Sequence, residues 1–126
     1  MNAADVLHEF GQAIGLQELK TDEHGHASLH LGSGRILTLE PGDRGMLLVG
    51  LSQPVAYDAA GWLFRAWKRA HHRHTARWPI QAGLRNTSDT PHLLVLIRLP
   101  ARDQSAPGLQ QAVEYLSRWL DDLRHV

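Results

Sequence analysis

The sequence contains no cysteine, which excludes disulfide scaffolds, thiolate metal sites and cysteine nucleophiles together. It has no excess of one charge either, because thirteen lysines and arginines balance thirteen aspartates and glutamates. A nucleic-acid or anionic membrane partner would therefore need a local basic patch. Long hydrophobic runs are also absent, since the longest aliphatic run, 93–97, is far too short to span a bilayer. The N-terminus lacks the pattern of a signal peptide, so we expect a soluble cytoplasmic protein.

With 126 residues, 43% of them hydrophobic and 21% charged, the chain has the size and composition of one globular domain, 1–126. Apolar spacings of three and four residues predict helices, and strict alternation predicts strands. In chain order the predicted elements are a helix at 6–14, strands at 26–31, 35–40 and 46–51, a helix at 56–72, strands at 77–84 and 92–99, and a helix at 109–123. They predict an α+β fold, a five-stranded antiparallel sheet with three helices in the order α-β-β-β-α-β-β-α.

Two of these strands carry information about their place in the sheet. The strand at 92–99 has five consecutive aliphatic residues, which favours a central strand covered on both faces. The strand at 77–84 contains Pro79, and a proline restricts that point to an edge, a strand start or a bulge.

Nine histidines invite a metal-site interpretation, especially His71, His72 and His74 with His24 and His26. Neither group has the His-Glu-x-x-His spacing that places two rings on one helical face, so a solvated helix end is favoured. No serine lies in a Gly-x-Ser-x-Gly elbow, and the acidic pairs fall at the ends of elements. We therefore expect no catalytic residue, no metal and no cofactor, with a histidine-dependent metalloenzyme or metal carrier as an alternative.

A local basic patch lies at the end of the second predicted helix. Five cations occur from Arg65 to Arg77 with no acidic residue between them, and Trp67 and Trp78 are near. Cations beside aromatic residues can bind single-stranded nucleic acid, so a small nucleic-acid-binding domain is the alternative function. A solvated face, or one side of an interface with an acidic partner, explains the same pattern.

The second predicted helix also carries a stripe of small apolar residues. Small side chains let two helix backbones approach closely, which favours a dimer across a twofold axis. The predicted dimer interface consists of Ala59, Leu63, Ala66 and Ala70, flanked by Trp62 and Trp67. The alternative is that this stripe packs on the sheet of its own subunit.

The element order and several local patterns resemble the class I type III secretion chaperones of the Tir chaperone family. The pattern Val6-Leu7-x-x-Phe10-x-x-x-Ile14-Gly15-Leu16 is similar to the opening helix of that family. The run Asp22-Glu23-x-Gly25, followed by alternating residues from Ala27 to Leu31, resembles its first hairpin. The chain differs from the typically acidic family members in being neutral, rich in histidine and basic from Arg65 to Arg77.

The resemblance implies a bacterial cytoplasmic homodimer that binds the N-terminal region of a secreted effector, keeps it secretion-competent and targets it to the secretion apparatus. A heterodimer with a second small chaperone is the alternative assembly. The effector would place apolar side chains in grooves between the first helix and the sheet, and could add a strand to a free edge. The predicted effector-binding residues are Leu7, Phe10 and Ile14 on the first helix, and Leu94 and Leu96 on the less covered face of the last strand.

Overall fold

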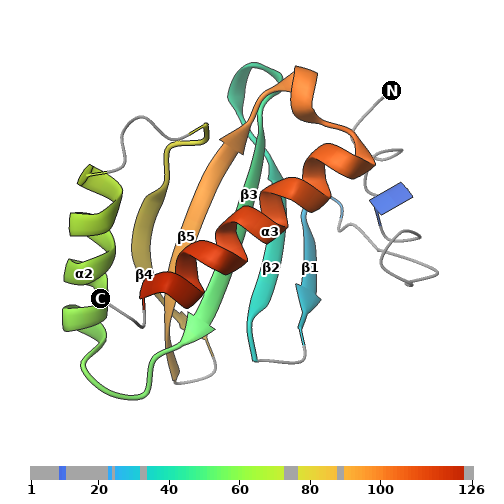
Figure 1. Cartoon of the computed structure of the whole chain (residues 1–126). Coiled ribbons are helices and arrows are strands. Elements are labelled where there is room, and N and C mark those ends of the chain that lie inside the picture. The colour runs from blue at the N-terminus through green and yellow to red at the C-terminus, as the bar shows by residue number, and fades with distance from the viewer. Residues whose placement is uncertain are drawn as a thin grey trace.

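The computed structural model describes residues 9–10, 23, 25–31, 34–72, 77–87 and 90–123. Over these ranges the chain forms a five-stranded sheet with two α-helices (Figure 1). The elements are β1 (Ala27–His30), β2 (Ile36–Pro41), β3 (Leu47–Pro54), α2 (Ala59–His72), β4 (Gln81–Thr87), β5 (Thr90–Leu99) and α3 (Ala106–Leu123), with 3₁₀ turns at Asp43–Gly45 and Ala101–Asp103. Glu9 and Phe10 are helical, and the rest of the predicted first helix lies outside the described residues. No helix among the described elements is long and apolar enough to cross a bilayer.

The strand order is β1-β2-β3-β5-β4, and every neighbouring pair is antiparallel. The predicted five-stranded antiparallel sheet is confirmed, and its first three strands form a meander. β4 lies at an edge and begins at Gln81, after Pro79, so the proline precedes the strand instead of interrupting it. β5 is an internal strand between β3 and β4, although the middle position belongs to β3.

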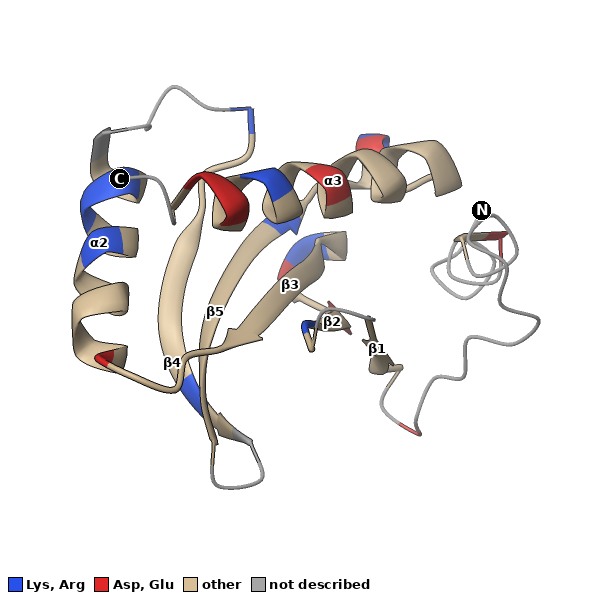
Figure 2. Ribbon diagram, turned by 60° about the horizontal axis from the view of Figure 1, so that its bottom comes forward, with Lys and Arg blue, Asp and Glu red and all other residues tan. Residues whose placement is uncertain are grey.

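The main core lies between α3 and one face of the sheet (Figure 2). On this face the register places Val49 of β3 beside Ile97 of β5, and Leu51 beside Val95, and all four are fully buried. α3 covers them with residues spaced three and four apart, as an amphipathic helix must. Its buried residues include Leu109, Ala112, Leu116, Leu120 and Leu123.

Helix α2 lies against the β4 edge of the sheet, beside α3 (Figures 1 and 2). It begins at Ala59, three residues later than the sequence predicts, because Asp58 has a φ of 55° and is not helical. The Asp58 carboxylate accepts a hydrogen bond from the Gly61 N–H at 3.2 Å and so caps the helix. A Cβ at Gly61 would collide with that carboxylate, which explains the glycine in the first turn.

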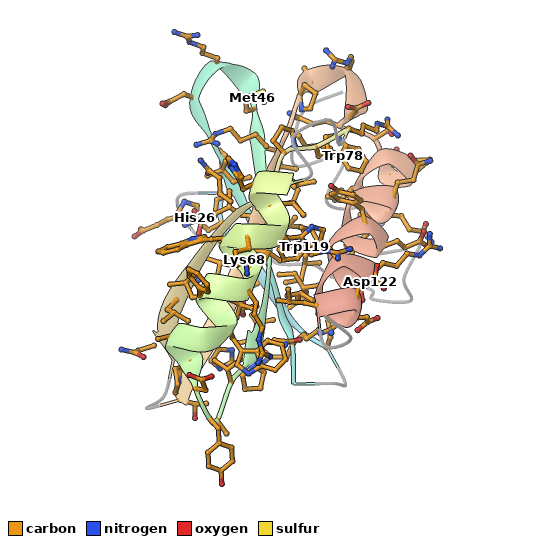
Figure 3. All side chains as sticks on the ribbon, turned by 60° about the vertical axis from the view of Figure 1, so that its left-hand side comes forward. His26, Met46, Lys68, Trp78, Trp119 and Asp122 are labelled. Carbon is orange, nitrogen blue, oxygen red and sulfur yellow. The ribbon has the colours of Figure 1, made fainter. Side chains whose placement is uncertain are left out.

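Two arginines hold the C-terminal end of α3. Arg35 is 6% exposed and forms an ion pair with Asp121 at 2.6 Å, while it also donates to Gln53 Oε1 at 3.1 Å. Arg69 of α2 pairs with Asp122 at 3.3 Å, and its guanidinium lies 5.5 Å from the ring centre of Trp119 (Figure 3). Carboxylates at a helix C-terminus oppose the helix dipole, so these cations offset an unfavourable charge while they join α3 to β2 and α2.

Candidate functional site

The face of the sheet opposite α3 carries no helix among the described residues, and we call it the open face (Figure 2). Because side chains alternate along a strand, Leu94 and Leu96 of β5 lie on this face while Val95 and Ile97 face α3. Across the sheet their neighbours are Gly50 and Ser52 of β3 and Gly83 of β4. Leu94 and Leu96 are half-buried, so the open face has an apolar centre that is only partly covered.

A groove of about 720 Å³ runs between α2, the β4 edge and the open face. We call it the α2–β4 groove; its lining is Trp67, Ala70 and His71 from α2, Ile80, Gln81, Ala82 and Gly83 from β4 and the residues before it, and Leu94 and Leu96 from β5. Gly83 leaves its floor open, because a Cβ there would meet no atom within 4 Å. A smaller hollow of about 60 Å³, lined by Gly50, Glu40 and Arg85 among others, shares Leu94 and Leu96 with the groove.

Four large apolar side chains on α2, on β4 and just before α2 are exposed, and one of them, Trp67, lines the groove. Phe64 and Trp67 of α2 are 60% and 53% exposed, Leu84 of β4 is 43% exposed, and Tyr57, just before α2, is 85% exposed. The indole N–H of Trp67 donates to the carbonyl of Ala82 at 3.0 Å, so Trp67 covers part of the outer edge of β4 while most of its ring stays accessible. Exposed apolar residues of this size make α2 and β4 a candidate interaction surface.

The elements that form this surface carry charge of one sign. α2 and β4 contain no aspartate or glutamate, and they contain four cations, Arg65, Lys68, Arg69 and Arg85. Arg69 is paired with Asp122. The guanidinium of Arg65 lies 4.9 Å from the ring centre of Trp62, and the ammonium of Lys68 lies 5.4 Å from that of Phe64. Cations held over aromatic faces are partly ordered before any partner arrives.

The predicted dimer residues divide into two groups. Ala66 is fully buried within the single chain, and Ala59, Trp62, Leu63 and Ala70 pack against its core. Ala66 therefore packs within its own chain, where the small alanine side chains let α2 approach the β4 edge closely, and the other four residues remain partly exposed. Trp67 differs from these residues in being exposed.

The predicted effector-binding residues also separate. Leu94 and Leu96 lie on the less covered face and line the α2–β4 groove together with Trp67. Phe10 is 1% exposed and belongs to the core, so its ring offers no free surface in the isolated chain. Leu7 and Ile14 lie outside the described residues. The sequence analysis did not include Phe64, Leu84 and Gly83 in any site, although the i, i+3 spacing of Phe64 and Trp67 places both on one stripe of α2.

The opposite edge of the sheet is a second candidate surface. Within the part of the chain that the structure describes, β1 pairs with β2 alone. The Leu31 N–H donates to the Arg35 carbonyl at 2.8 Å, and the alternation of antiparallel pairs then turns the backbone groups of Ser28 and His30 away from β2. Leu29 and Leu31, next to them, are half-buried against the core. A strand edge of this kind is a template for an added strand.

The two candidate surfaces are thus an apolar groove and the outward-facing edge of β1, both of a kind that binds other chains. Among the described residues, no group of three or more His, Asp or Glu could hold a metal ion. The model of the Tir chaperone protein (CesT) family matches residues 5–119. The chain therefore belongs to the Tir chaperone family, and the resemblance to class I type III secretion chaperones is confirmed. Family membership gives no support to the nucleic-acid alternative.

Three solved structures share the fold. The Yersinia pestis type III secretion chaperone SycH, solved in complex with a stable fragment of YscM2, has a TM-score of 0.68 at 19% identity, covering 98% of both chains. The HopA1–SchA chaperone–effector complex contains a chain with a TM-score of 0.68 at 22% identity, covering 97% of this chain and 92% of that one. The ExsC–ExsE complex gives a TM-score of 0.67 at 21% identity, with coverage of 98% and 92%. A search of curated protein sequences found no match.

Proposed function

We propose that this protein is a type III secretion chaperone that binds the N-terminal region of a secreted effector, keeps it soluble and competent for export, and targets it to the secretion apparatus. The observation that carries the proposal is the match of the family model to residues 5–119. Supporting it, the whole fold is shared with chains solved as a chaperone–effector complex and as a secretion chaperone bound to a fragment of another protein. Such a protein acts by recognition and needs no catalytic residue.

The client surface in this proposal is the β1 edge. The backbone groups of Ser28 and His30 that point away from β2 can hydrogen-bond an extended segment, whatever its side chains, while Leu29 and Leu31 lie beside it to receive apolar residues. Phe10 supports this end of the molecule from within the core. Ordering an unfolded segment costs conformational entropy, so the client must bury a large surface along this edge and beyond it.

The α2–β4 groove, in contrast, is proposed as the interface with a second chaperone chain. A client leaves the chaperone during export, whereas Phe64, Trp67 and Leu84 need cover throughout the life of the protein. A permanent partner meets that need, and it also fills the groove around Leu94 and Leu96. These two leucines therefore move from the effector-binding set to the pairing surface, and the sequence-based homodimer is the simplest form of the pair.

The test of client binding combines capture with a backbone substitution. The tagged chain is purified from its native cytosol, and bound proteins are identified by mass spectrometry. We expect one or two secreted proteins, protected from proteolysis in their N-terminal regions. Ser28→Pro removes an N–H that points away from β2 and leaves the β1–β2 ladder intact, so it should release the client, while Ser28→Ala should retain it. Equal retention by both variants, or capture without any secreted protein, would contradict the proposal.

A further inference from the structure

We call the exposed side of α2 and β4, together with the α2–β4 groove, the α2–β4 surface. We infer that this surface pairs preferentially with a non-identical, acidic chain rather than with a second copy of this protein. The inference rests on the proposed use of this surface for pairing and names its partner's chemistry. Three observations carry it: the sign of the charges on the surface, their position around the exposed apolar residues, and the absence of carboxylates from the groove.

Although the net charge of the chain is zero, its positive and negative side chains are unevenly distributed among the elements. α2 and β4 hold four cations and no carboxylate. The rest of the sequence then holds nine basic and thirteen acidic side chains, a net of minus four, because the whole chain has thirteen of each. The pairing surface is thus positive, and the remainder of the protein is negative.

The cations surround the apolar residues that would enter an interface. Phe64 and Trp67 share one stripe of α2, and Arg65 and Lys68 form the adjacent stripe at the same i, i+3 spacing. Arg85 follows the exposed Leu84 on β4. Of these three cations none has a carboxylate within 4.0 Å among the described residues. Glu40 and Arg85 both line the smaller hollow, which shares Leu94 and Leu96 with the groove, whereas the lining of the groove itself contains no carboxylate.

Symmetry turns this arrangement into a preference. A twofold pair of identical chains brings the same patch of each against the other, so Arg65, Lys68 and Arg85 would face α2 and β4 of the second copy, which carry four cations and no carboxylate. Like charges brought together across an interface are unfavourable, and opposite charges favour association and select the partner. Because Arg65 and Lys68 already lie over aromatic rings, an acidic partner gains ion pairs with little further ordering of these side chains.

The test uses a charge-swapped variant of this chain as the acidic partner of the wild type. The charge-swapped probe carries Arg65→Glu, Lys68→Glu and Arg85→Glu, all at exposed positions. Self-association of the wild type, and its association with the probe, are measured by sedimentation equilibrium and fluorescence anisotropy at 50 and 500 mM NaCl. We expect the mixed pair to be at least about tenfold tighter than the wild-type homodimer at low salt, and the difference to disappear at high salt. Wild-type self-association should strengthen as salt is added.

Two controls separate the possible failures. Arg102→Glu changes an exposed cation in the turn before α3, and it should leave all association constants unchanged. Gly83→Phe places a ring on the groove floor, where there is room for a side chain because a Cβ at this position would have no atom within 4 Å. This variant should abolish both the wild-type homodimer and the mixed pair. If Gly83→Phe abolishes pairing but the wild type self-associates as tightly as the mixed pair at low salt, the charge inference is overturned alone. If Gly83→Phe leaves pairing intact, the proposed pairing surface is itself refuted.

Discussion

Replacing Arg35 by methionine should destabilise the fold by about 2–3 kcal/mol, which is large for a single charged side chain. Arg35 is 6% exposed and donates to Gln53 Oε1, to Ser117 Oγ at 3.0 Å and to Asp121. Gln53 is itself buried, so its amide oxygen would lose its partner without access to water, at a cost of about 1–3 kcal/mol. The Asp121 side chain is 58% exposed, so water takes over part of its solvation, and the full penalty for breaking a buried pair does not apply.

The assay is urea unfolding followed by circular dichroism, with Arg77→Met as the matched control. Arg77 also pairs with an aspartate, Asp103 at 3.1 Å, but its side chain is 58% exposed, so its loss should cost less than about 1 kcal/mol. Adding Gln53→Leu to Arg35→Met removes the unsatisfied amide, and the double variant should recover part of the lost stability. Equal effects of the Arg35 and Arg77 substitutions, or no recovery in the double variant, would refute this reasoning.

Three further predictions concern the core, the open face and the pairing surface. Phe10→Ala should lower the free energy of unfolding by about 3–5 kcal/mol in urea titrations, because its ring is fully buried; a loss below 1 kcal/mol would contradict its place in the core. Gly50→Ala should destabilise by about 1–3 kcal/mol, since its Cβ would lie 2.7 Å from Thr38 Oγ1, whereas Gly83→Ala, with open space, should leave the urea midpoint unchanged or raised. Phe64→Ser should change the unfolding free energy by less than about 0.5 kcal/mol but weaken pairing in sedimentation runs, and unchanged pairing would exclude Phe64 from the interface.

The sequence predicted the elements of the sheet well because alternation is a local property. Each described strand overlaps a predicted one, whereas the edge position of β4 was one of three options that Pro79 left open, and the proline itself precedes the strand. Boundaries were less accurate where a single backbone conformation decides them, as at Asp58, whose positive φ delays the start of α2. The buried Arg35 could not be anticipated, because its partners Gln53 and Asp121 are separated from it by 18 and 86 residues and meet it only in the folded chain.

The interface residues were harder to predict because an apolar stripe does not specify what covers it. The stripe with Ala66 and Ala70 satisfies the requirements for packing on another subunit and on the same sheet equally well. In the folded chain Ala66 is fully buried within its own subunit, whereas Phe64 and Trp67 on the neighbouring stripe are exposed. The sequence could not distinguish core from surface for Leu94 and Leu96 for a similar reason, since both faces of β5 are aliphatic and only α3 distinguishes them; the fold leaves both residues half-buried.

The separation of charge also explains how one small protein could keep its two proposed partners apart. The β1 edge and the α2–β4 surface are the two opposite edges of one sheet, so a client strand and a partner chain can bind together without competing for backbone groups. The cations are concentrated at the pairing edge, while β1 (Ala27–His30) contains no lysine, arginine, aspartate or glutamate. An acidic partner is therefore drawn to α2 and β4, and a client recognised through its backbone is drawn to β1. Raising the salt concentration should thus weaken the mixed pair but leave client binding at β1 nearly unchanged, and an equal loss of both would show that the two edges are not independent.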